Sequence, residues 1–181
     1  MVKTANNFED LAKVLLKELS GRARDVVERR FGIGTRAKRQ TLESIGQTYK
    51  ITRERVRQIE AAAINKMRLS SAFAGSDQIF SELEKEFDAR EKVWREDEVL
   101  THFAENDGGK NYVYFFLSLG KLFERLGADA EFYHRWTSDA KSASEAHKTI
   151  RNFCNALSDD PMTKDEIAAK FKNHAESEVG R

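Results

Sequence analysis

The sequence predicts a mainly α protein. Apolar residues recur at steps of three and four along much of the chain, a single Pro occurs in 181 residues, and strand-rich runs are missing. Small and polar residues at 69–76 mark a boundary. We therefore predict an N-terminal helix-turn-helix bundle at 1–70, a winged-helix-like module at 77–140 and a partial second helical unit at 144–181.

Composition limits the class of protein. The chain is 40% hydrophobic and 34% charged, which suffices for packed cores beneath a wet surface. No apolar run is long enough to cross a membrane, and the first residues lack the layout of a signal peptide. The lone Cys154 excludes an intrachain disulfide and a multi-cysteine metal site. We expect no membrane partner.

A helix predicted over 8–19 leads into two further helices within residues 41–68. In the first of these, Leu42, Ile45 and Tyr49 form one apolar stripe. Gly46 has no Cβ and lets the second helix approach closely. The spacing is that of a helix-turn-helix.

The turn falls at Lys50-Ile51, and Thr52 stands where the second helix needs an N-cap. The inward face of that helix is apolar and comprises Val56, Ile59, Ala63 and Met67. Its other side carries guanidinium, amide and carboxylate groups, which can reach base edges and phosphates in the major groove. These residues are Arg53, Glu54, Arg55, Arg57 and Gln58. A charged face that is only solvated, with Glu–Arg surface pairs, explains this pattern equally well.

Charge is unevenly distributed. Residues 20–68 contain 13 Lys and Arg against 5 Asp and Glu, a net charge of +8 within a chain of net +1, so the remainder carries −7. A basic module is thus joined to an acidic remainder, and nucleic-acid binding by the basic part should weaken steeply with salt.

The segments LSGRARDVVERRFGI (19–33), TLESIG (41–46) and TRERVRQIE (52–60) resemble region 4 of primary bacterial sigma factors, which reads the minus-35 promoter element. The resemblance implies base contacts by Arg53, Glu54 and Gln58. The phosphate contacts that it implies, together with two that we expect from the basic linker TRAKRQ (35–40), involve Thr41, Leu42, Arg55, Arg57, Lys38 and Arg39.

The chain departs from this family at Ala62 and Asn65, where basic residues are usual, and at Lys50, where Gly, Asp or Asn often stands. The resemblance is confined to residues 19–68, and no segment resembles the sigma region that melts the minus-10 element and grips the core polymerase. We therefore expect that this chain does not initiate transcription as a complete sigma factor.

In the second module we expect helices over 77–91, within 95–103 and over 111–126, with a turn at 106–111. Gly127 is the expected C-cap of the third helix, and residues 131–138 suit a short strand or wing. Because the module is acidic and its third helix is apolar, we expect it to pack or to bind protein rather than to read DNA.

Two helices are expected over 145–157 and 164–171. The order of a helix and PMTKDEIAAKF (161–171) resembles the opening of a HARE-type helix-turn-helix, a unit found in the delta subunit of RNA polymerase. Its third helix and wing would lie beyond Arg181, so we expect a longer protein, although a plain helical hairpin is the alternative.

The sequence offers little support for catalysis. The histidines have no metal-ligand spacing and are scattered over positions 102, 134, 147 and 174. Asp-Gly-Gly-Lys (107–110) lacks the pattern of a phosphate loop, and Cys154 is expected on a buried face. We expect no catalytic residue, metal or cofactor.

These observations favour a cytoplasmic, nucleoid-associated regulator of transcription that binds double-stranded DNA sequence-specifically. The alternative is an interaction module that docks on the β flap of RNA polymerase, or on an anti-sigma partner, without reading DNA. Its apolar docking face would include Val26, Val27 and Phe31, although we favour a core position for these residues.

Overall fold

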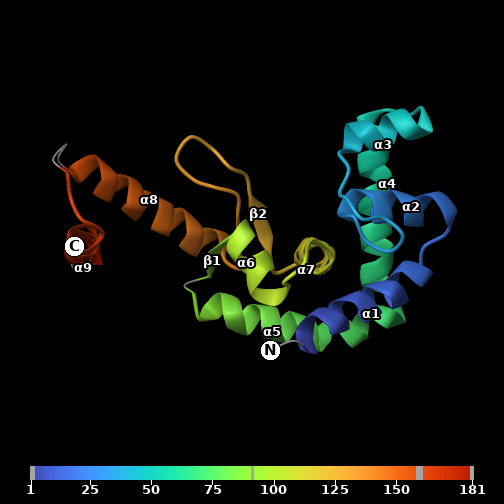
Figure 1. Cartoon of the computed structure of the whole chain (residues 1–181), viewed down its shortest axis with the longest axis horizontal. Coiled ribbons are helices and arrows are strands. Elements are labelled where there is room, and N and C mark those ends of the chain that lie inside the picture. The colour runs from blue at the N-terminus through green and yellow to red at the C-terminus, as the bar shows by residue number, and fades with distance from the viewer. Residues whose placement is uncertain (1–2, 91, 158–160, 180–181) are drawn as a thin grey trace. The chain divides into compact units, whose positions relative to one another are not determined.

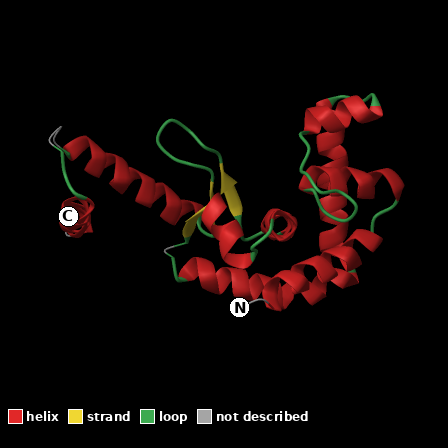
Figure 2. Ribbon diagram, in the orientation of Figure 1, coloured by secondary structure: helices red, strands yellow, loops and turns green. Residues whose placement is uncertain are grey.

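The computed structural model describes residues 3–90, 92–157 and 161–179. It forms two compact units, residues 1–138 and residues 139–181, which are described separately. The mainly α prediction is confirmed, because the described residues form nine α-helices, one 3-10 helix and a small antiparallel sheet (Figure 2). None of these helices has the length and apolar character needed to cross a membrane.

Unit 1 begins with four helices, which are α1 (Lys3–Lys17), α2 (Gly21–Phe31), α3 (Leu42–Tyr49) and α4 (Arg53–Leu69). Both α2 and α3 pack on α4 (Figure 1). Val26, Ile45 and Val56 form the small core between α2, α3 and α4, and the partly buried Leu42, Tyr49, Ile51 and Ile59 pack around it. The predicted helix-turn-helix is therefore present.

Local chemistry sets the turn of this motif. The Thr52 hydroxyl accepts a hydrogen bond from the backbone N–H of Arg55 at 3.1 Å and caps α4, as the sequence predicts. Lys50 adopts the left-handed conformation with φ 55°, which costs some backbone energy. A Cβ on Gly46 would lie 2.7 Å from the carbonyl oxygen of Ile51, so the close approach is to the turn rather than to the second helix.

The second half of unit 1 has the element order of a winged helix. After a 3-10 helix η1 (Ser71–Ser76) come α5 (Asp77–Asp88), β1 (Val93–Arg95), α6 (Glu96–Phe103), α7 (Asp107–Leu119), β2 (Glu124–Leu126) and β3 (Arg135–Thr137). The sheet order is β1-β3-β2 and both pairs are antiparallel, with Trp136 opposite Trp94 and Arg125. The loop between β2 and β3 forms the wing.

The bounds predicted for the third helix of this module are wrong at both ends. The Asn106 side chain caps α7 by accepting from the backbone N–H of Gly109 at 2.8 Å, so 107–110 form the first helical turn. The helix ends at Leu119, and the chain then turns at Gly120 in a crowded place, where a Cβ would lie 2.8 Å from Phe123. Residues 124–126 then form a strand, and Gly127 is not a helix cap.

One hydrophobic core runs through both halves of unit 1. The helix α1 packs on α7, and the Phe8 ring lies 5.4 Å from the ring of Phe116. The Phe31 and Phe115 rings are 5.3 Å apart. Arg68 at the end of α4 donates to the carbonyl oxygen of Leu119 at 2.8 Å. The two halves recognised in the sequence therefore share their packing.

Unit 2 contains two helices, α8 (Ala140–Ala156) and α9 (Lys164–Val179). They meet through Phe153 and Phe171, whose rings are 5.0 Å apart. Thr163 and Glu166 form a capping box at the start of α9. Cys154 is exposed, so its predicted burial is wrong, because the inward face of α8 is set by its neighbour Phe153. The HARE-type resemblance stays a prediction.

Candidate nucleic-acid interface

The helix α4 presents a polar face to solvent along its first half. Its opposite face is buried through Val56, Ala63 and Met67, which fixes the rotation of the helix. The exposed residues are those that the sequence predicts as nucleic-acid contacts: Arg53, Glu54, Arg55, Arg57 and Gln58. The structure thus brings the predicted group together on one surface.

These side chains are held by one another. Arg57 donates two hydrogen bonds to Glu54 at 2.8 and 2.7 Å, and Gln58 donates to the same carboxylate at 3.4 Å. The hydrogen bond from Arg57 lowers the pKa of Glu54, which therefore stays charged. Arg55 donates to the Gln58 side-chain oxygen at 3.2 Å. Within the described part of the chain, Arg53 makes no side-chain hydrogen bond or ion pair.

The N-terminus of α3 lies beside this face. The Thr41 hydroxyl accepts from the backbone N–H of Ser44 at 3.1 Å, which leaves the N–H groups of Leu42 and Glu43 outside the helical ladder. A hollow is lined by these residues together with Arg30 and Arg53. A helix N-terminus and the guanidinium group of Arg53 favour an anion in this hollow, whereas Arg30 is paired with Glu60 at 3.4 Å and Glu43 also lines it.

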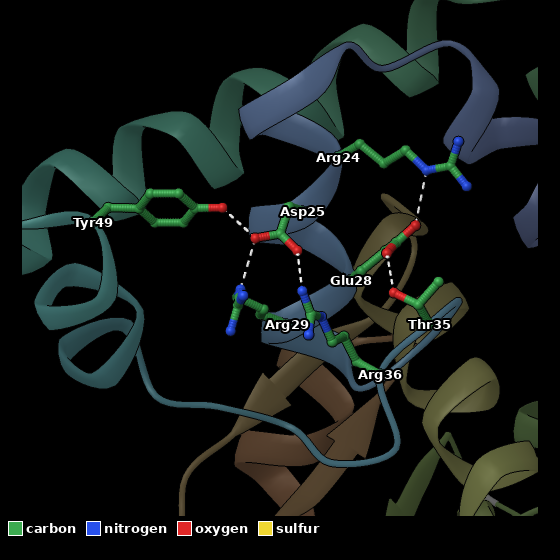
Figure 3. Close-up of polar contacts among 7 residues, drawn as sticks. All are labelled: Arg24, Asp25, Glu28, Arg29, Thr35, Arg36 and Tyr49. Atoms are coloured by element: carbon green, nitrogen blue, oxygen red, sulfur yellow. Dashed lines mark hydrogen bonds and ion pairs between the residues drawn. The ribbon is translucent and has the colours of Figure 1, made fainter.

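Loop 32–40 is tied to α2 through Asp25, a residue that the sequence did not single out (Figure 3). The Asp25 carboxylate accepts from Arg29 at 2.6 Å, from Arg36 at 2.7 Å and from the Tyr49 hydroxyl. Burial raises the pKa of Asp25, but these hydrogen bonds outweigh it and lower the pKa to about 2. In the sequence, only the i,i+4 spacing of Asp25 and Arg29 indicated an ion pair at this position.

A second carboxylate, Glu28, fixes the same loop (Figure 3). It is buried and accepts from Arg24 at 2.8 Å and from the Thr35 hydroxyl at 2.9 Å. Gly34 has φ 65°, and a Cβ there would lie 2.8 Å from the Glu28 carboxyl carbon. The loop is therefore held in one shape by two carboxylates of one helix.

The two basic residues predicted from this loop are both exposed, but they differ in surroundings. Arg39 lies over the ring of Tyr114 on α7, with 4.2 Å from its guanidinium carbon to the ring centroid. The side chain of Lys38 makes no hydrogen bond or ion pair with the residues that the structure describes. Arg39 thus joins the helix-turn-helix to the winged half of the unit.

Side chains that could bind a metal do not gather in the described part of the chain. The structure brings together no three His, Cys, Asp or Glu residues able to hold a metal ion there. His102 lies 3.3 Å from Glu86, and His134 accepts from the backbone N–H of Ala128. The side chain of His174 lies outside the described residues.

Comparison with known proteins identifies the segment that contains this surface. Residues 15–69 match the family model for Sigma-70, region 4. The resemblance noted in the sequence is thereby confirmed for this part of the chain, which contains α2, α3 and α4.

The relatives are RNA polymerase sigma factors, and this chain matches a small part of each. RNA polymerase sigma factor SigA of a Nostoc species is 53% identical over 60 residues, which are 33% of this chain and 15% of that protein. SigA of Microcystis aeruginosa is 52% identical over 60 residues, covering 33% and 14%. RpoD of Neisseria gonorrhoeae is 40% identical over 62 residues, covering 34% and 10%. The chain therefore aligns with about one seventh of the cyanobacterial relatives.

Proposed function

We propose that this protein is a transcription regulator that binds double-stranded DNA in a sequence-specific way, with α4 as the recognition helix in the major groove. The observation that supports this most directly is the exposed polar face of α4 within a segment that matches Sigma-70, region 4. A buried apolar face and a capped start hold that helix as a rigid reader.

The proposed base contacts are Arg53, Glu54 and Gln58. Arg can bond guanine bidentately, Gln can bond adenine, and Glu can accept from the amino group of cytosine. The bonds that Glu54 accepts from Arg57 and Gln58 restrict its rotamers before DNA arrives, which lowers the entropy cost of binding.

The proposed phosphate contacts surround this group: Thr41, Leu42, Arg55, Arg57, Lys38 and Arg39. Thr41 and Leu42 would act through the backbone N–H groups at the start of α3, where the helix dipole favours an anion. The arginines and Lys38 would act through charge. These contacts set affinity and salt dependence, whereas the base contacts set sequence preference.

RNA polymerase is the second proposed partner, because the relatives are named RNA polymerase sigma factors. The apolar docking face considered from the sequence is not available for this role. Val26, Val27 and Phe31 are at most 2% exposed and form part of the core, as favoured from the sequence. Docking on the polymerase β flap or on an anti-sigma partner would have to use another surface.

Selection of bound duplexes from a random pool, using the full chain, tests the proposal. We expect enrichment of one short motif whose recovery falls as salt rises. The activity proposed here is regulation on the nucleoid in the cytoplasm and involves no catalysis. A pool that stays random after several rounds, while polymerase is retained in a pull-down, would instead favour the interaction module.

A further inference from the structure

Three hollows on unit 1 share lining residues in series, and we call them together the wing groove. The first is the anion-type hollow at the start of α3, with Arg30 and Thr41. The second shares both residues and adds Arg39 and His134. The third shares Arg39 and His134 and extends to Lys110. The groove therefore leads from the recognition helix to the first turn of α7 and the base of the wing.

The centre of the groove carries unbalanced positive charge. The guanidinium carbons of Arg39 and Arg125 lie 4.2 and 5.8 Å from the centroid of the same Tyr114 ring. Glu96 neutralises Arg125 through hydrogen bonds of 2.5 and 3.1 Å and also accepts from Trp136. Among the residues that the structure describes, Arg39 has no carboxylate within ion-pair distance, and it acts on Glu96 only at longer range.

Lys110 supplies a second uncompensated charge at the far end. It lies in the first turn of α7, and no carboxylate of the described residues lies within ion-pair distance of it. The two carboxylates in this part of the lining have arginine partners, because Asp97 is held by Arg95 at 2.6 Å and Glu96 by Arg125 at 2.5 Å. The groove thus offers cations at both ends of its winged half.

The rest of α7 is not available to DNA. Every residue from Asn111 to Leu117 is buried, because α1, α2 and α6 pack around the helix. Asn111 donates to the carbonyl oxygen of Gly32 at 3.0 Å, which anchors α7 to the loop after α2. The winged module therefore cannot insert its third helix into a major groove. Its accessible basic residues near α4 are those that line the wing groove.

We propose that the wing groove binds the phosphodiester backbone of the same duplex that α4 reads, so that the winged module extends the contact with flanking DNA. This inference rests on the proposed function. The backbone strand held at the start of α3 would continue past Arg39 to Lys110 and His134. Such contacts recognise charge and are independent of sequence.

The test compares Lys110→Gln with Lys121→Gln in the full chain. Both variants remove one lysine charge from the winged module, and Lys121 is exposed but lies outside the wing groove. Binding is measured by fluorescence anisotropy on a duplex of about three helical turns, with the selected site central or scrambled, over a range of salt. Lys110→Gln should weaken both duplexes equally, by about threefold or more, and lower the salt slope by about 0.9. Lys121→Gln should match the unchanged protein.

Hydroxyl-radical footprinting gives a second measurement. Lys110→Gln, alone or with Arg39→Gln, should lose protection at one end of the footprint and keep it over the selected site. If both lysine variants behave alike while the site is still selected, the inference is wrong and the proposed function stands. If the full chain binds no duplex, both fail. If Lys110→Gln abolishes competition by polyglutamate and leaves DNA binding unchanged, the groove binds an acidic protein and the inference is wrong.

Discussion

At the scale of single residues, Asp25 joins three segments next to the proposed interface. Its carboxylate joins α2 to Arg36 in the linker and to Tyr49 at the end of α3 (Figure 3). It thereby sets the distance between the basic loop and the helix-turn-helix. The residue lies away from the proposed DNA contacts, so its influence on binding would be through position alone.

We predict that Asp25→Asn lowers the free energy of unfolding at pH 7 by about 1–2 kcal/mol, since a charged acceptor of three hydrogen bonds is lost. The pKa of Asp25 is depressed from its ordinary value to about 2, so its stabilising effect is present above about pH 4 and is lost as the pH falls through 2. Urea unfolding at pH 7, pH 4 and pH 2 measures both effects.

Asp88→Asn, at an exposed position on α5, serves as the control. The difference in stability between Asp25→Asn and the unchanged protein should shrink between pH 4 and pH 2. A difference that stays constant over this range would show that the carboxylate charge at position 25 is not what stabilises the fold.

At the scale of elements, the turn between α3 and α4 was predictable because each position has one local requirement. The sequence alone shows a capping residue at Thr52, a small residue at Gly46 and an apolar stripe on each helix. The third helix of the winged module was mispredicted, because Asp-Gly-Gly-Lys favours a turn by composition while the Asn106 cap and the burial of the following residues favour a helix.

Features that depend on tertiary contacts could not be predicted from the sequence. The pairing of β1 with β3 and the placing of Arg39 over Tyr114 depend on contacts between residues far apart in the chain. The polar residues of α4 were predicted correctly as an exposed group, because helical periodicity alone decides which side of α4 is apolar.

We predict that Gly46→Ala destabilises the helix-turn-helix by about 1–3 kcal/mol, because the new Cβ would meet the Ile51 carbonyl oxygen at 2.7 Å and backbone must shift. Gly127→Ala is the matched control, since nothing lies within 4 Å of a Cβ there. Thermal unfolding of both variants measures the effect. Equal melting temperatures would contradict the close approach described for this turn.

At the scale of the molecule, unit 1 should unfold as one body, because its two halves share a core. Phe8 lies at the centre of that core and contacts both Phe103 and Phe116. We predict that Phe8→Ala costs about 3–5 kcal/mol and lowers hydrogen-exchange protection in α4 and α7 together. Val14→Ala, at a position that is 44% exposed on the same helix, should cost far less. Loss of protection confined to α7 would mean that the halves unfold independently.

The central claim is that the exposed face of α4 reads bases. The most direct test is the ratio of affinities for the selected and scrambled duplexes, measured for Arg53→Ala/Gln58→Ala beside Gln78→Ala/Lys85→Ala, a control pair exposed on α5. With about 1–3 kcal/mol for each good base contact, the first pair should reduce the ratio at least tenfold and leave the scrambled duplex nearly unaffected. The control pair should leave the ratio unchanged. An equal loss on both duplexes for Arg53→Ala/Gln58→Ala would contradict base readout by α4.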